Sequence, residues 1–144
     1  MQDVETVTAV DQNRGLVGLF FKALRKGDKK GLRSVFSPDA VWHVPQSGGI
    51  EDPSGVEAII DLLTGAPFEF YRPETAKFHV DFLIVDDQHA ALQFRMTCTT
   101  ARDTAYDNLY VFSYRFADGV IAEGWEHTDT AYWQATVRGA SEFS

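Results

Sequence analysis

The residues best suited to acid–base chemistry are polar side chains set among small or apolar neighbours, and Glu126 is the first of them. Successive side chains of an extended strand point to opposite faces, so Ala122, Gly124, Glu126 and Thr128 would share one face. The small neighbours Ala122 and Gly124 would leave room for a ligand. A carboxylate desolvated in an apolar pocket has a raised pKa and is a better base near neutral pH. Glu126 is therefore the leading catalytic candidate.

Two other arrangements of the same segment stay open. A β-bulge would exchange the two faces of the strand and turn His127 and Asp129 inward in place of Glu126. Alternatively, Glu126 lies on the outer face, either solvated or paired across the strands with Arg95 or Arg115. The alternating pattern is compatible with each of these arrangements.

Asn108 and His43 are two further candidates for catalysis. Asn108 interrupts a run of aromatic residues along one strand face, and a buried amide needs hydrogen-bond partners. We expect it to donate to a substrate oxygen, to orient Glu126, or else to make a structural hydrogen bond. His43 titrates near neutral pH and suits general acid or base catalysis; its alternative is a partly exposed position at a strand edge.

Aromatic residues make up 13% of the chain, which is enough to line an apolar pocket as well as to fill a core. Trp42 and His43 are adjacent on a short predicted strand, so only one of them can enter a cavity. Tyr106 or Tyr110 could donate a hydrogen bond to a developing oxyanion, and otherwise forms part of the core or pocket wall. The predicted ligand-binding residues are Trp42, Phe20, Leu24, Tyr106, Tyr110 and Phe112.

Apolar residues at helical spacing predict two helices near the start of the chain. The first starts near Asp11 or Asn13 and ends at Gly27, and the second spans residues 29–36. A short strand over residues 39–45 follows them. The first helix therefore presents one apolar stripe to the rest of the molecule.

A third helix and a run of strands complete the predicted fold. The sequence Ser54-Gly55-Val56-Glu57 has the form of a capping box that opens this helix, and Gly65 is its expected end. After Pro73 the periodicity changes to two, which is typical of strands joined by tight turns. Helices followed by a meander predict an α+β fold with a strongly curved antiparallel sheet over three helices. The expected strands span residues 78–84, 92–98, 106–116 and 120–132, with Phe78, Val80, Phe82 and Ile84 sharing a face.

Charge and composition exclude several classes of function. The formal net charge is −8 without a basic stripe, so we expect no binding to nucleic acid or to an anionic membrane. Cys98 is the only cysteine and the histidines lack metal-ligand spacing, so we predict no metal site. No phosphate-cradling glycine loop occurs, and we predict no cofactor. The absence of a signal-peptide core and of a membrane-length apolar run predicts a cytoplasmic protein.

Five short motifs follow one another in an order typical of one protein family. They cover residues 40–45 (Ala-Val-Trp-His-Val-Pro), 54–59, 106–110 (Tyr-Asp-Asn-Leu-Tyr), 118–121 and 126–129 (Glu-His-Thr-Asp). In this order they resemble the NTF2-like superfamily, specifically its SnoaL-like or ketosteroid-isomerase-like branch. The expected organisation is a flexible arm over residues 1–12, a single SnoaL-like domain over residues 13–135 and a C-terminal tail over residues 136–144.

The resemblance implies a cone-shaped sheet, an NTF2-like or cystatin-like roll packed on three N-terminal helices, with the pocket inside the cone. It also implies a homodimer formed through the sheet, whose outer face mixes polar side chains with Leu109, Val111 and Trp125. In the resembling cyclases and epoxide hydrolases, an acid near the position of Glu126 points into the cavity. Trp42 is implied as a wall residue of the same cavity.

The combined interpretation is a cofactor-free enzyme of isomerase, cyclase, dehydratase or hydrolase type. It would act by proton transfer on a small apolar molecule that carries a carbonyl, an enol or an epoxide. One alternative is a dimeric module that binds a small ligand in the same cavity without reacting with it. Another is a protein-trafficking adaptor like the namesake of the superfamily, which the acidic charge permits.

Overall fold

The first helix, α1 (Ala9–Lys26), opens the part of the chain that the computed structural model describes, residues 8–139. It begins earlier than expected because the Thr8 side chain accepts a hydrogen bond from the Asp11 N–H at 3.1 Å and caps the helix. Residues 9–12 of the predicted arm are thus helical, while residues 1–7 lie outside the described part. The helix ends as predicted at Gly27, whose φ of 65° is left-handed.

The next elements, α2 (Lys29–Val35) and β1 (Phe36–His43), follow each other without a loop. The Asp28 side chain accepts from the Gly31 N–H at 3.0 Å and caps α2. The strand begins three residues before the predicted one because Phe36 pairs with Ile121 of a later strand. This pairing lies outside the reach of any local sequence pattern.

Helix α3 (Val56–Phe70) differs from its prediction at both ends. Its N-cap is Gly55, with no side-chain hydrogen bond, so the predicted capping box at Ser54 does not form. The helix also continues through Gly65 and Pro67, although proline removes one backbone donor. Phe70, in the last turn, packs edge-on against Trp133 with ring centroids 5.2 Å apart, and such tertiary packing overrides local propensity. Two short 3₁₀ turns flank α3, η1 (Gln46–Gly48) and η2 (Pro73–Thr75).

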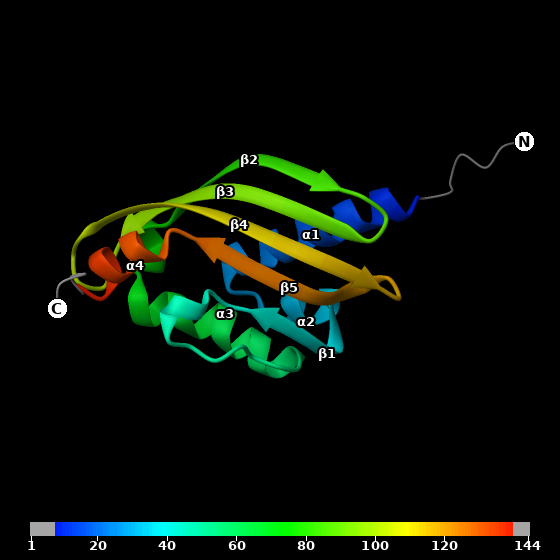
Figure 1. Ribbon diagram of the computed structural model, residues 1–144, viewed down its shortest axis with the longest axis horizontal. Helices are drawn as coiled ribbons and strands as arrows, with labels where there is room; N and C mark the ends of the chain where they lie inside the picture. Colours follow the sequence, from blue (N-terminus) through cyan, green and yellow to red (C-terminus); the bar gives the residue numbers. More distant parts are fainter. Residues whose placement is uncertain (1–7, 140–144) are drawn as a thin grey trace, which may run out of the picture.

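The sheet has five strands and stays open, and it arches over α1, α2 and α3 (Figure 1). Its last four strands pair antiparallel in chain order, as predicted, and β1 adds a parallel edge beside β5, so the sheet is mixed. None of the helices in residues 8–139 is long and apolar enough to cross a membrane. The order is β1-β5-β4-β3-β2, with β2 (Lys77–Val85), β3 (His89–Thr99), β4 (Ala105–Ala117) and β5 (Val120–Thr128).

A register shift in β2 corrects one predicted strand face. The shift falls between Val80 and Phe82, so Val80 pairs with Phe94 on the inner face whereas Phe82 pairs with Gln93 on the outer face. A β-bulge inserts one residue and exchanges the faces beyond it. Phe82 and Ile84 are therefore 44% and 63% exposed on the convex side rather than sharing a face with Phe78.

The chain closes with a helix that the sequence pattern did not predict, α4 (Thr130–Val137). The predicted final strand to residue 132 is wrong beyond Thr128, because the Asp129 side chain accepts from the Tyr132 N–H at 3.1 Å and caps this helix. The predicted tail starts inside α4, and residues 140–144 lie outside the described part. Figure 1 shows α4 at one end of the arched sheet, near the C-terminal end of α3.

Candidate functional site

A cavity of about 250 Å³ lies between the concave face of the sheet and the helices. Helices α1, α3 and α4 contribute to its wall, together with the segment that follows β1. Most of the residues around it are apolar or aromatic, which is the usual lining of a small-molecule site. The aromatic side chains that line it are Phe68, Phe70, Tyr71, Phe78, Phe94, Tyr110, Phe112 and Trp133.

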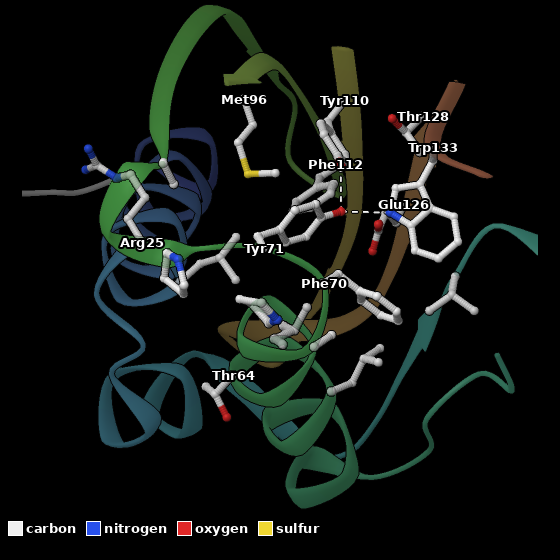
Figure 2. Close-up of a pocket in the computed structure, with 18 of the residues that line it drawn as sticks. Arg25, Thr64, Phe70, Tyr71, Met96, Tyr110, Phe112, Glu126, Thr128 and Trp133 are labelled. Atoms are coloured by element: carbon white, nitrogen blue, oxygen red, sulfur yellow. Dashed lines mark hydrogen bonds between the residues drawn. The ribbon is translucent and has the colours of Figure 1, made fainter. Parts of the chain in front are cut away.

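Glu126 on β5 faces this cavity and is the only carboxylate among the described residues that line it (Figure 2). It pairs across the sheet with Phe112, which also lines the cavity, so both side chains lie on the concave face. Its Oε1 accepts a hydrogen bond from the Trp42 indole Nε1 at 3.2 Å. Burial raises the pKa of Glu126 above its ordinary value, and the Trp42 hydrogen bond opposes this with a smaller lowering. The carboxylate is thus placed to accept or deliver a proton.

Trp42, which hydrogen-bonds Glu126, does not itself line the cavity. Its indole is fully buried and stacks on Phe20 with ring centroids 5.5 Å apart. It crosses β5 directly over Gly124, where an added Cβ would lie 2.4 Å from the indole ring. Only glycine at position 124 therefore admits this ring, and the packing fixes the donor that reaches Glu126.

Three tyrosine hydroxyls, which we call the tyrosine chain, are linked by hydrogen bonds: Tyr71 and Tyr110, which line the cavity, and Tyr106 behind them. The oxygen of Tyr110 is 3.3 Å from that of Tyr71 and 2.6 Å from that of Tyr106. The Trp133 Nε1 donates to Tyr71 at 2.8 Å, and the Asn108 Nδ2 donates to Tyr106 at 2.9 Å (Figure 2 draws the Tyr71 end). Burial raises the pKa of all three hydroxyls, so they stay protonated at neutral pH.

The predicted ligand-binding residues divide into two groups. Leu24, Tyr110 and Phe112 line the cavity, and their contact with a ligand stays a prediction. The other three are buried one layer behind the lining and support it: Phe20, Trp42 and Tyr106.

Asn108 does not reach the cavity. It is 3% exposed, its Nδ2 donates to Tyr106 and to the Asp129 carbonyl, and its Oδ1 accepts from the Leu109 N–H at 2.9 Å. With these partners it makes a structural hydrogen-bond set and neither contacts Glu126 nor is placed to contact a ligand. The expectation that it orients Glu126 or binds substrate directly is corrected accordingly.

His43 lies on the outer side of the sheet and not in the cavity. Its two ring nitrogens contact the carboxylates of Asp52 at 2.9 Å and Glu123 at 2.5 Å, and its ring stacks on Trp125. The hydrogen bond to Glu123 raises the pKa of His43, a rise that burial reduces and Asp52 reinforces. The geometry therefore does not support the predicted catalytic role for this residue.

The structure also differs from the alternative in which a bulge turns the opposite face of β5 toward the cavity. His127 is exposed and pairs with Val111 on the convex face, and Asp129 caps α4. No register shift falls between Gly124 and Thr128, so the alternation that placed Glu126 inward holds over this stretch.

The family model for the SnoaL-like domain matches residues 17–124, which is most of the chain. The chain belongs to the SnoaL-like family. A search of curated proteins finds no match.

Solved structures similar to this SnoaL-like chain support the fold. Bal32a from a soil-derived mobile gene cassette is 25% identical with a TM-score of 0.79, over 91% of this chain and 100% of that one. A protein of Jannaschia sp. CCS1 assigned as a SnoaL-like polyketide cyclase is 18% identical with a TM-score of 0.79, over 98% and 100% of the two chains. TerC, co-crystallized with polyporic acid, is 18% identical with a TM-score of 0.78, over 88% and 98%.

Two site residues of this SnoaL-like domain escaped the sequence pattern, Tyr71 and Trp133. Tyr71 lies just beyond α3 in a segment without periodicity, and Trp133 lies on α4, which the pattern assigned partly to a strand. The signal that could have placed Trp133 is Asp129, a strong N-cap residue ahead of it. Nothing local marks Tyr71, because long-range contacts place it.

The SnoaL-like cavity combines one desolvated carboxylate with a group of protonated hydroxyls in an apolar wall. Such a pair can move a proton at one atom of a ligand while hydrogen-bonding an oxygen nearby. Over residues 8–139, no group of three or more His, Cys, Asp or Glu side chains is placed to hold a metal ion.

Proposed function

We propose that this SnoaL-like protein is a cofactor-free enzyme in which Glu126 transfers a proton within a small, largely apolar carbonyl, enol or epoxide compound. The observation that carries the proposal is the position of Glu126, which is the only carboxylate lining the cavity within residues 8–139 and has a pKa raised by burial. A base whose pKa lies closer to neutrality transfers protons more effectively in both directions.

The chemistry follows from the two polar groups of the cavity. With a carbonyl ligand, the Glu126 carboxylate takes a proton from the carbon next to the carbonyl, and the electron pair moves onto the oxygen. A tyrosine hydroxyl of the tyrosine chain donates a hydrogen bond to that oxygen, which carries the developing negative charge. The protonated Glu126 then returns its proton to carbon, which gives an isomer or allows a ring closure.

The substrate class follows from the wall of the cavity. Stacked and edge-on rings, among them Phe94 and Tyr110 with centroids 5.3 Å apart, favour a flat aromatic or polyene body. Two structural relatives point the same way, because one was crystallised with polyporic acid and another is assigned as a polyketide cyclase. We therefore place the substrate among carbonyl-rich, unsaturated compounds of this kind.

The experiment measures deuterium uptake by the methyl group of acetylnaphthalene in deuterium oxide, which reports proton abstraction whatever the natural product is. Wild type should accelerate the exchange, and Glu126→Gln should slow it by about a hundredfold, the usual contribution of a general base. Glu123→Gln is the matched control, since Glu123 lies on the outer face of the same strand. It should exchange like wild type.

The alternative function is a module that binds a small ligand without reacting with it. The same apolar lining favours it, because the described part of the chain supplies one carboxylate to the cavity and no second acidic group to assist it. Wild-type protein that binds acetylnaphthalene but leaves its exchange rate at the buffer value would support binding alone. Exchange that Glu126→Gln leaves unchanged would assign the chemistry to another group.

A further inference from the structure

We propose that Asn108 and Trp133 are positioning residues that direct one hydroxyl proton of the tyrosine chain into the cavity, so that the site takes ligands through an acceptor oxygen. The inference deepens the proposed function, since it names the group by which a substrate is held. It rests on the two ends of the tyrosine chain and on a count of its protons.

At one end of the tyrosine chain lies a group that can only donate a hydrogen bond. The Trp133 Nε1 donates to the Tyr71 oxygen at 2.8 Å, and an indole nitrogen has no acceptor capacity. Tyr71 therefore cannot pass its own proton to Trp133.

At the other end of the tyrosine chain, Asn108 likewise acts as a hydrogen-bond donor. Its Nδ2 faces the Asp129 carbonyl at 3.2 Å, which can only accept, and its Oδ1 faces the Leu109 N–H, which can only donate. These two contacts fix the orientation of the amide, so the group that meets the Tyr106 oxygen at 2.9 Å is the NH₂ donor. Tyr106 in turn cannot pass its proton to Asn108.

A proton count leaves one hydroxyl hydrogen over. Three hydroxyls carry three protons, but only two hydroxyl–hydroxyl hydrogen bonds join them in the described structure, Tyr71 to Tyr110 and Tyr110 to Tyr106. Since both ends of the chain are donors, the third proton has no acceptor within the chain. Each contact uses one proton, whichever oxygen donates.

The spare proton belongs to Tyr71 or Tyr110. Tyr106 is 2% exposed and has no acceptor in the described structure except Tyr110, and a buried donor without a partner is costly. Tyr106 therefore donates to Tyr110. Both Tyr71 and Tyr110 line the cavity, and neither makes a hydrogen bond to Glu126 in the described structure, so the remaining hydroxyl proton faces the cavity.

This polarity selects the chemistry of the ligand. A carbonyl, quinone or enolate oxygen accepts the spare proton, whereas an ammonium or another donor-only group finds no acceptor in the tyrosine chain. An apolar ligand without oxygen leaves the donor unmet, which is the situation in which sites discriminate most strongly.

The decisive variant is Asn108→Asp, compared with Asn108→Leu. A carboxyl at position 108 accepts the Tyr106 proton in either protonation state, so all three hydroxyls then donate toward it and none faces the cavity. Leucine removes the amide donor but supplies no acceptor, so the spare proton stays in the cavity. Both variants lose the hydrogen bond of Nδ2 to Asp129, and leucine also loses the one to Leu109. If only the lost hydrogen bonds mattered, leucine would therefore have at least as large an effect.

The probes are acetylnaphthalene and its oxygen-free counterpart ethylnaphthalene, with the ratio of their dissociation constants measured by calorimetry. One neutral hydrogen bond predicts a preference of wild type for the ketone of about fivefold. Asn108→Leu should keep this preference and Asn108→Asp should lose it. The infrared carbonyl stretch of the bound ketone should be lowered in wild type and Asn108→Leu, and should move back up in Asn108→Asp.

A second set of variants keeps the test open should Asn108→Asp fail to fold. Tyr71→Phe leaves the spare proton on Tyr110, and Tyr110→Phe leaves it on Tyr71, so each single variant should retain a ketone preference that the double variant loses. Loss of the preference in either single variant, its persistence in folded Asn108→Asp, or its absence from wild type would overturn the proposal. Equilibrium binding decides these outcomes, so a protein that binds the ketone without exchanging its protons would contradict the proposed function and leave this inference standing.

Discussion

Glu126 depends on one neighbour for its ionisation, because Trp42 is the one side chain that hydrogen-bonds it in the described structure. Burial raises the pKa of the carboxyl, and the indole N–H lowers it by stabilising the charged form. The two effects have opposite signs, so they can be separated by removing the donor alone.

Trp42→Phe should therefore raise the pKa of Glu126 further. Phenylalanine keeps an aromatic ring in the same buried position but has no N–H to offer, while the desolvation remains. An isotope-edited NMR titration of the Glu126 carboxyl measures the change directly, and the acid limb of the exchange rate should move to higher pH with it. Trp125→Phe, on the opposite face of β5, is the matched control and should leave the pKa in place. An unchanged or lowered pKa in Trp42→Phe would show that the hydrogen bond is not what tunes Glu126.

At the scale of the elements, the sequence was sufficient wherever local periodicity decided the structure. The first helix ends at Gly27 and the antiparallel meander follows its predicted order, because αL glycine and period-two alternation act within a few residues. The inward face of β5 also followed from alternation, since no bulge interrupts it between Gly124 and Thr128. Alternation therefore puts Glu126 on the concave face, and its catalytic role stays a prediction.

The elements that were missed are set by contacts between distant segments. Helix α3 passes through Gly65 and Pro67 while its last turn packs on α4, and the bulge in β2 changes the face of Phe82. Asn108 was expected in the cavity because its strand face is aromatic, but the cavity ends before Tyr106. Tertiary packing decides how far a cavity extends along a strand, and the periodicity of the sequence does not reveal it.

The cluster around His43 ties three elements together and gives the fold a pH-dependent contact. His43 on β1 bridges Asp52, in the segment before α3, and Glu123 on β5, which also accepts from Arg115 on β4. Only the protonated ring can donate to both carboxylates, because a neutral imidazole has one N–H. The segment that carries Asp52 also contributes Val44 and Ile50 to the cavity wall.

His43→Gln should lower the free energy of unfolding at acidic to neutral pH and have progressively less effect as the pH rises. The pKa of His43 is raised in the folded state, so its contribution is complete below the unfolded value of about 6.5 and is lost as the pH rises through the folded value. For a partly exposed cluster the difference should be about 1 kcal/mol or less. Urea unfolding at about pH 6 and about pH 9, with exposed His79→Gln as the control, measures it. A difference that grows toward alkaline pH would contradict the bridging role.

At the scale of the whole molecule, the convex face of the sheet is the surface that most resembles an interface. The charges that border its centre are already paired within the chain, Arg95 with Asp107 and Arg115 with Glu123. Its centre is largely uncharged, and exposed apolar side chains gather there on β2 and β4. Two rows of paired residues across the strands form this centre. One row is Phe82, Gln93, Val111 and His127, and the other is Ile84, Ala91, Ser113 and Trp125.

We propose that two copies of this chain associate through these rows, and Val111→Asp should then separate them. The net charge of −8 makes copies repel each other, and a surface with an uncharged centre adds the least to this repulsion. An unpaired carboxylate buried at that centre should raise the dissociation constant at least about a hundredfold. Leu19→Asp is the matched control, because Leu19 is 57% exposed on α1, which packs on the concave side of the sheet. Sedimentation at micromolar concentration should find wild type and Leu19→Asp dimeric and Val111→Asp monomeric, whereas a monomeric wild type would rule out this interface.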